Sequence, residues 1–202
     1  MKPRPDPEKF AKAMVKQKAA VTRSLARATT EQGVLILLTG DGKGKTTSGF
    51  GMVFRALGYG QKVGVVQFIK GTQKSGEELL LASHYPEVEF HQMATGFTWD
   101  TQNHAADSAA AERSWAHAEK MLQDPGFDLI LLDELTYMIA HRNLDEDRII
   151  DCLQNRPAHQ SVIVTGRGGG AALRRVADTV SEVKNIKHAF DAGIKARQGV
   201  DY

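Results

Sequence analysis

The sequence predicts an α/β protein in which helices cover both faces of a mainly parallel sheet of about six strands. Two observations support this prediction. From residue 33 onward, short apolar runs alternate with segments whose apolar residues keep helical spacing. The runs are continuously apolar, which is typical of parallel strands buried on both faces by the helices of right-handed crossovers. Three layers, helix on sheet on helix, are therefore expected.

The expected strands follow one another along the chain in the order of the apolar runs. They cover residues 34–38, 63–68, 88–90, 129–132, 162–164 and 179–183. Most of the intervening segments keep helical spacing, and 202 residues suit one ordinary domain with a core and a ligand cleft. We expect that domain to cover residues 33–202.

Residues 1–32 predict a separate basic arm. Asp6 supplies an N-cap, Pro7 suits the first helical position, and an amphipathic helix is expected to follow. Residues 1–30 hold eight Lys or Arg against Asp6 and Glu8, a charge of +6, and because the whole chain carries +2 the remainder carries −4. A solvated surface helix and a lid or partner-binding helix both fit this pattern. The acids of the arm weigh against a mitochondrial presequence.

Composition narrows the function classes. The chain is 42% hydrophobic and 25% charged, in the range of globular proteins, and no apolar run is long enough to cross a membrane. A single cysteine, Cys152, allows no internal disulfide, and we expect a cytoplasmic protein without a secretory signal. The acidic body makes nucleic acid an improbable general partner.

The segment after the first expected strand is a phosphate-binding loop, the P-loop. It leads directly into an expected helix at 48–57, and its residues are Gly40, Asp41, Gly42, Lys43, Gly44, Lys45, Thr46 and Thr47. Glycines allow the backbone N–H groups to wrap a phosphate chain, and a helix N-terminus favours an anion. Lys45 is expected to neutralise phosphate oxygens, and Thr46 to offer its hydroxyl to Mg²⁺.

The glycine spacing departs from the usual P-loop. The common pattern places its first glycine at position 39, where this chain has Thr39, and Gly40 follows one residue later. This departure makes an ordinary NTPase, which presents its terminal phosphate to water, a weaker interpretation.

A pair of acids, Asp133 and Glu134, follows the apolar run at 129–132. Acids at the carboxyl end of a parallel strand face the phosphate loop and hold or orient the metal in P-loop proteins. The alternative is that they cap the helical segment that begins at Leu135.

At this point the sequence resembles the P-loop family of ATP:corrinoid adenosyltransferases. Six ordered segments carry the resemblance: the loop 40–47, then Val65-Val66-Gln67-Phe68-Ile69-Lys70-Gly71, Gly96-Phe97-Thr98-Trp99-Asp100-Thr101-Gln102, Leu132-Asp133-Glu134, Thr165-Gly166-Arg167, and Ile186-Lys187-His188-Ala189-Phe190-Asp191-Ala192-Gly193. They span residues 33–202. The resemblance implies the RecA-like P-loop NTPase fold, and transfer of the 5′-deoxyadenosyl group of ATP to a Co(I) corrinoid with release of triphosphate.

The resemblance also implies how the site works. ATP lies reversed in the loop, so that its ribose 5′-carbon faces the cobalt, and no protein nucleophile is needed. Lys45 would stabilise the leaving triphosphate, Thr46 and Glu134 would ligate Mg²⁺, and Asp41, Lys43, Thr47 and Arg167 would contact the nucleotide. Phe97 and Trp99 would displace the lower axial ligand of the corrinoid, which raises the reduction potential of Co(II).

Further family properties are expected here: a homodimer, a flavoprotein electron donor and an N-terminal arm that covers the corrinoid. Asp100 departs from the family's usual Glu, and Gly168 to Gly170 is unusually rich in glycine. Core packing is the alternative for Phe97 and Trp99. The seven histidines show no metal-binding spacing, although His188 lies in a family-like segment. A P-loop kinase or NTPase whose arm binds nucleic acid or protein is the rival function, and a non-catalytic nucleotide-binding regulator is a third.

Overall fold

The computed structural model describes residues 6–69, 74–93 and 104–202. They fall into two units, with the boundary between residues 31 and 32. The second unit holds a six-stranded sheet in which every strand pair is parallel, in the order β3-β2-β4-β5-β1-β6. The strands are β1 (Leu35–Thr39), β2 (Val63–Gln67), β3 (Glu89–Gln92), β4 (Leu129–Asp133), β5 (Ser161–Thr165) and β6 (Thr179–Glu182). All six expected strands are confirmed, with ends that agree to within two residues.

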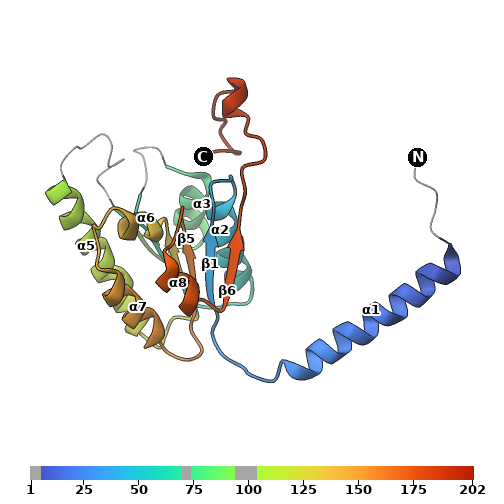
Figure 1. Ribbon diagram of the computed structural model, residues 1–202. Coiled ribbons are helices and arrows are strands. Elements are labelled where there is room, and N and C mark those ends of the chain that lie inside the picture. The colour runs from blue at the N-terminus through green and yellow to red at the C-terminus, as the bar shows by residue number, and fades with distance from the viewer. Residues whose placement is uncertain (1–5, 70–73, 94–103) are drawn as a thin grey trace. The chain divides into compact units, whose positions relative to one another are not determined.

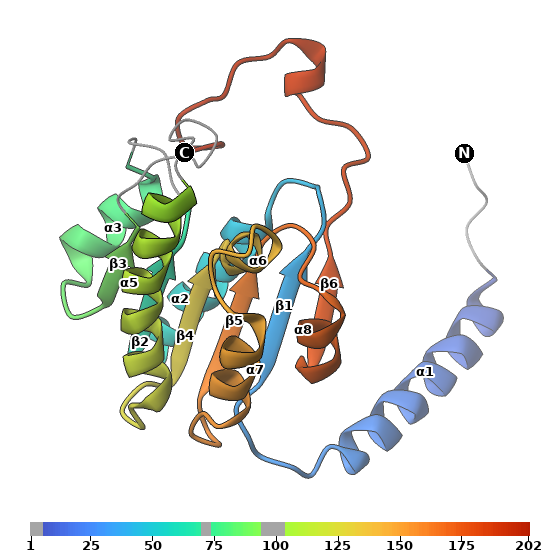
Figure 2. The same ribbon diagram turned by 60° about the vertical axis from the view of Figure 1, so that its left-hand side comes forward.

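Helices cover both faces of this sheet, as the continuous apolar runs predict (Figures 1 and 2). Figure 2 shows α5 and α7 in front of the sheet and α2 behind it. Among the described residues, the helices of the second unit are α2 (Lys45–Gly58), α3 (Gly76–His84), α5 (His104–Gln123), α6 (Leu135–Ala140), α7 (Glu146–Gln154) and α8 (Ala171–Val176), with a 3₁₀ turn at Phe190–Ala192. The mainly parallel three-layer fold is therefore confirmed.

Two apolar cores fill the spaces between these layers. One core packs α2 and α3 on the sheet through side chains such as Phe50, Val53 and Leu81. The other packs α5 to α8 on the opposite face and centres on Trp115, which is fully buried. Successive strand residues point into opposite cores. Leu131, for example, belongs to the core under α2 and α3, and Leu132 belongs to the core under α5 to α8. Helices thus pack on both faces of the sheet, and the edge formed by the carboxyl ends of its strands is available for a binding site.

The expected N-terminal helix is confirmed as α1 (Pro7–Arg27). Asp6 caps it through a hydrogen bond from the Glu8 N–H to its carboxylate, at 3.0 Å. No residue of α1 is buried, and its apolar side chains are exposed, Phe10 to 54% and Leu25 to 69%. The helix therefore forms on local signals, without packing within its own unit.

Candidate functional site

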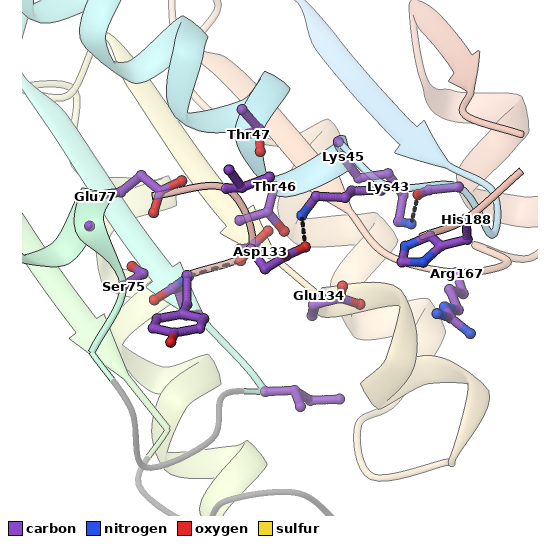
Figure 3. Close-up of a pocket in the computed structure, with 18 of the residues that line it drawn as sticks. Lys43, Lys45, Thr46, Thr47, Ser75, Glu77, Asp133, Glu134, Arg167 and His188 are labelled. Atoms are coloured by element: carbon purple, nitrogen blue, oxygen red, sulfur yellow. Dashed lines mark hydrogen bonds and ion pairs between the residues drawn. The ribbon is translucent and has the colours of Figure 1, made fainter. Parts of the chain in front are cut away.

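The main cleft of the second unit lies at the carboxyl edge of the sheet, where the P-loop and the acidic pair meet. Its volume is about 1110 Å³. Figure 3 shows Lys45, Thr46 and Asp133 near its centre, with Ser75 and Glu77 on one side and His188 and Arg167 on the other. Loops after parallel strands converge at this edge, which is where α/β folds bind ligands.

The P-loop is shaped by close packing against the end of β6. Gly40 has a φ of 103°, and a Cβ atom there would lie 2.3 Å from the carbonyl oxygen of Val183. Gly42 donates its N–H to the same oxygen at 2.8 Å. Gly44 has a φ of 119°, yet nothing lies within 4 Å of a Cβ built on it. Gly40 is thus required by packing and by backbone conformation, and Gly44 by conformation alone.

Lys45 is the buried cation of the loop, with 7% of its surface exposed. Its Nζ donates to the carbonyl oxygen of Gly42 at 2.9 Å, which folds the side chain back along the loop. Burial lowers the pKa of Lys45, and Glu134 opposes this effect. A phosphate group in the loop would supply the counter-charge that this ammonium lacks.

The helix after the P-loop begins earlier than the sequence suggests. The expected start was residue 48, whereas α2 begins at Lys45. Thr46 and Thr47 therefore lie in its first turn, and both line the cleft. Gly44 occupies the N-cap position and has no side chain to satisfy the N–H groups of that turn. These donors, and the positive end of the helix dipole, are available to an anion.

The two acids at the end of β4, Asp133 and Glu134, lie in different environments. Asp133 is 2% exposed, and both of its carboxylate oxygens accept hydrogen bonds, from Gln67 at 2.9 Å and Thr165 at 2.6 Å. Glu134 lines the cleft, and its carboxylate does not cap α6. Burial, followed by the nearby Asp133, raises the pKa of Glu134. The capping alternative is excluded for Glu134, which leaves its carboxylate facing the P-loop.

Arg167 lies on the loop that follows β5. Its carbonyl oxygen accepts a hydrogen bond from the Thr136 hydroxyl at 2.8 Å, which ties this loop to α6. The adjoining Gly168 carbonyl oxygen accepts from the Thr39 hydroxyl at 2.6 Å. Gly168, Gly169 and Gly170 all have positive φ. The unusual glycine run thus follows a backbone path that other residues rarely adopt, and the Arg167 side chain lines the cleft.

The C-terminal segment supplies cleft residues that the sequence analysis missed. Asp41 accepts a hydrogen bond from the Asn185 N–H at 3.1 Å, and Lys43 forms an ion pair with Asp201 at 2.9 Å. The Asp41 pKa is lowered mainly by that backbone N–H and by its own. Asn185 and Asp201 both line the cleft. The sequence alone did not identify Asp201, because Lys43, with which it pairs, lies at the other end of the domain sequence.

Some expected site residues lie outside the described part of the chain, Phe97 and Trp99 among them. Within the described residues, no three His, Cys, Asp or Glu side chains gather as a metal site, and no helix is long and apolar enough for a membrane span. His188 lines the cleft, as its place in the sequence suggested. His91 and His117 stack at 3.9 Å between ring centroids, and neither is among the residues that line this cleft.

Comparison with known proteins identifies the family. A model of the family "ATP:corrinoid adenosyltransferase BtuR/CobO/CobP" matches residues 31–202. The corrinoid adenosyltransferase of Escherichia coli K12 is 51% identical over 96% of this chain and 98% of its own length. Corrinoid adenosyltransferase CobA of Salmonella typhimurium is 52% identical over the same shares, and the Pseudomonas aeruginosa protein is 49% identical over 94% and 93%.

A solved structure supports the fold alone. The flagellar accessory protein FlaH from Methanocaldococcus jannaschii superposes with a TM-score of 0.50 at 13% identity, over 75% of this chain and 71% of FlaH. The P-loop cleft and the near full-length sequence matches lead to one conclusion: the chain belongs to the ATP:corrinoid adenosyltransferase family.

Proposed function

We propose that this chain transfers the 5′-deoxyadenosyl group of ATP to the Co(I) centre of a corrinoid, in the biosynthesis or salvage of adenosylcobalamin. Cobalt attacks the ribose 5′-carbon and a cobalt–carbon bond forms. The bond from that carbon to oxygen breaks, and its electron pair leaves with the intact triphosphate. The observation that carries the proposal is a preformed P-loop cleft in a chain matched by this family over residues 31–202.

The residues of the P-loop stabilise the leaving group in this proposal. Lys45 and the N–H groups of the first turn of α2 face the cleft, so charge that develops on the triphosphate meets fixed positive dipoles and one ammonium. Asp41, Lys43, Thr47 and Arg167 line the same cleft and are assigned to the nucleotide. The reversed direction of ATP, with its ribose toward the corrinoid, is part of the proposal.

The donor set fits Mg²⁺. The Thr46 hydroxyl and the Glu134 carboxylate would be hard oxygen ligands, and both residues line the cleft. Mg²⁺ in phosphate sites needs only one or two protein ligands beside phosphates and water. When bound, Mg²⁺ would offset the negative charge of the departing triphosphate. Asp133, held by two donors, is assigned to support rather than to ligation.

The hydrogen bonds of Asp133 bear on the rival function, ATP hydrolysis. A hydrolase needs an acid that can orient or deprotonate water. Both oxygens of Asp133 already accept hydrogen bonds within the protein, so this carboxylate is poorly placed for that role. The rival kinase or NTPase function would then depend on Glu134 alone.

Five finer assignments belong to the proposal. Phe97 and Trp99 displace the lower axial ligand of the corrinoid, and a flavoprotein reductase supplies the electron that converts Co(II) to Co(I). The enzyme acts as a homodimer in the cytoplasm, where ATP and a reducing environment are both present. Residues 1–32 form a lid, for which the exposed apolar side chains of α1 supply a contact surface.

A product assay tests the proposal. The protein is mixed in the dark, without oxygen, with MgATP and a chemically reduced corrinoid. We expect a light-sensitive cobalt–carbon spectrum and one triphosphate for each corrinoid converted. Release of ADP and phosphate without any corrinoid would instead establish the kinase or NTPase function, and ATP binding without either product would indicate a regulator.

A further inference from the structure

Three neighbouring strands, β2, β4 and β5, end in polar side chains that form one buried network. Gln67, Asp133 and Thr165 are each at most 2% exposed. The Asp133 carboxylate accepts from the Gln67 side-chain amide at 2.9 Å and from the Thr165 hydroxyl at 2.6 Å. A carboxylate that accepts from two donors is held in one orientation. The single hydroxyl proton of Thr165 is therefore committed to Asp133.

The same hydroxyl also contacts the next residue along β4. Thr165 Oγ1 accepts a hydrogen bond from the backbone N–H of Glu134 at 3.0 Å. Since its proton points to Asp133, a lone pair of the oxygen faces Glu134. One hydroxyl on β5 thus joins the side chain of Asp133 to the backbone of Glu134. This arrangement is possible because β5 pairs directly with β4.

Glu134 needs such a restraint because its backbone is left-handed. Its φ is 59° and its ψ is 22°, and within the described residues only Arg142 among the non-glycines also has a positive φ. Residues with a Cβ persist in this region only where the surrounding structure holds them. The conformation turns the chain from β4 into α6 and leaves the Glu134 carboxylate on the cleft wall.

We infer that Thr165 is a positioning residue for Glu134. Its hydroxyl holds the Glu134 backbone in the left-handed conformation, which aims the carboxylate at the position where Mg²⁺ binds with ATP. This inference rests on the proposed function. The neighbouring glycine supports it, since a Cβ on Gly166 would lie 2.1 Å from the Thr136 hydroxyl and 3.2 Å from the Glu134 carboxylate. The residue after Thr165 is thus packed directly against the turn that Glu134 and Thr136 form.

Thr165→Val tests the inference, because valine keeps the shape of the side chain and removes only the hydroxyl. The dissociation constant of ATP is measured by calorimetry without corrinoid, once with saturating Mg²⁺ and once in EDTA. In the wild type, Mg²⁺ is expected to tighten ATP binding. We expect Thr165→Val to reduce this effect of Mg²⁺ by about tenfold or more while binding in EDTA changes by less than about twofold, as for other residues that orient a metal ligand. Thr165→Ser should restore the effect.

Thr136→Val is the matched control. Thr136 is 1% exposed and its hydroxyl also makes a buried hydrogen bond in this turn, but to the Arg167 carbonyl oxygen rather than to Glu134. Its thermal stability should also fall, but by less, because Thr136→Val loses one buried hydrogen bond and Thr165→Val loses two, while the effect of Mg²⁺ on ATP binding stays at the wild-type value.

Each other outcome overturns the inference. A wild-type Mg²⁺ effect in Thr165→Val, an equal loss of ATP binding in EDTA and in Mg²⁺, or an equal loss of the Mg²⁺ effect in Thr136→Val would show that the hydroxyl does not act through Glu134. If Mg²⁺ fails to tighten ATP binding even in the wild type, the metal assignment of the proposed function fails as well. The two failures are therefore distinguishable.

Discussion

Asp201→Asn tests whether the C-terminal segment competes with nucleotide for the P-loop. Asp201 Oδ1 lies 2.9 Å from Lys43 Nζ, and Oδ2 accepts from the Arg197 N–H at 2.8 Å. That backbone hydrogen bond, followed by the one from Lys43, lowers the pKa of Asp201, so the side chain is an anion at neutral pH. A triphosphate in the loop is repelled by this carboxylate and competes with it for the Lys43 ammonium.

The size of the effect follows from the exposure of the pair. The Lys43 and Asp201 side chains are 42% and 27% exposed, so the pair is partly solvated. Water screens the attraction, and ordering both side chains costs entropy, so an exposed pair of this kind shifts a binding equilibrium by at most about fivefold. Asp201→Asn should therefore lower the ATP dissociation constant by up to about fivefold at low salt, and by less at high salt.

Calorimetric titration with MgATP, without corrinoid, measures this change. Asp191→Asn is the matched control, because Asp191 also lines the cleft from the C-terminal segment but forms no ion pair with the described residues. A smaller gain is expected from it. Unchanged or weaker ATP binding in Asp201→Asn, or an equal gain in Asp191→Asn, would refute competition at Lys43.

Three further predictions follow from the site and from the histidine pair. Lys45→Ala should abolish adenosyl transfer in an anaerobic assay, because it removes the buried ammonium of the loop, and wild-type turnover would contradict its role. Trp99→Ala should reduce turnover more when the corrinoid is supplied as Co(II) than as chemically reduced Co(I), and equal losses would remove the ligand-displacement role. Burial, followed by His117, lowers the pKa of His91 in the folded state, so the unfolded state binds the proton more readily. The free energy of unfolding should therefore fall as the pH drops below about 6.5, and urea titrations should show a weaker fall in His91→Asn.

The strands could be predicted from sequence because a strand that is buried on both faces of the sheet has a continuous run of apolar residues. The run that became β4 is apolar from end to end, and all of its residues are buried. Strand ends were less accurate, since pairing with a neighbour decides them. β1, for example, begins at Leu35 rather than Val34 and includes Thr39, whose side chain reaches Gly168.

The candidate site was predictable where its residues belong to local motifs, namely the P-loop and the acids that follow an apolar run. The P-loop residues and Glu134 lie together around one cleft, although their expected contacts with nucleotide and metal stay predictions. The difference between Asp133 and Glu134 was not predictable, because it depends on Gln67 and Thr165 at the ends of other strands. The pairing of Asp201 likewise depends on how the chain returns to the loop.

The contact between the P-loop and the end of β6 has a consequence for how an anion is received. Val183 and Lys184 occupy the space beside Gly40 and Gly42, so that half of the loop is already shaped by the protein's own backbone. A loop that is ordered in advance loses little conformational freedom when it closes on phosphate. Alanine at either position would displace the backbone of Val183 and Lys184 from its contact with the loop. The loop would then have to become ordered each time that a nucleotide binds.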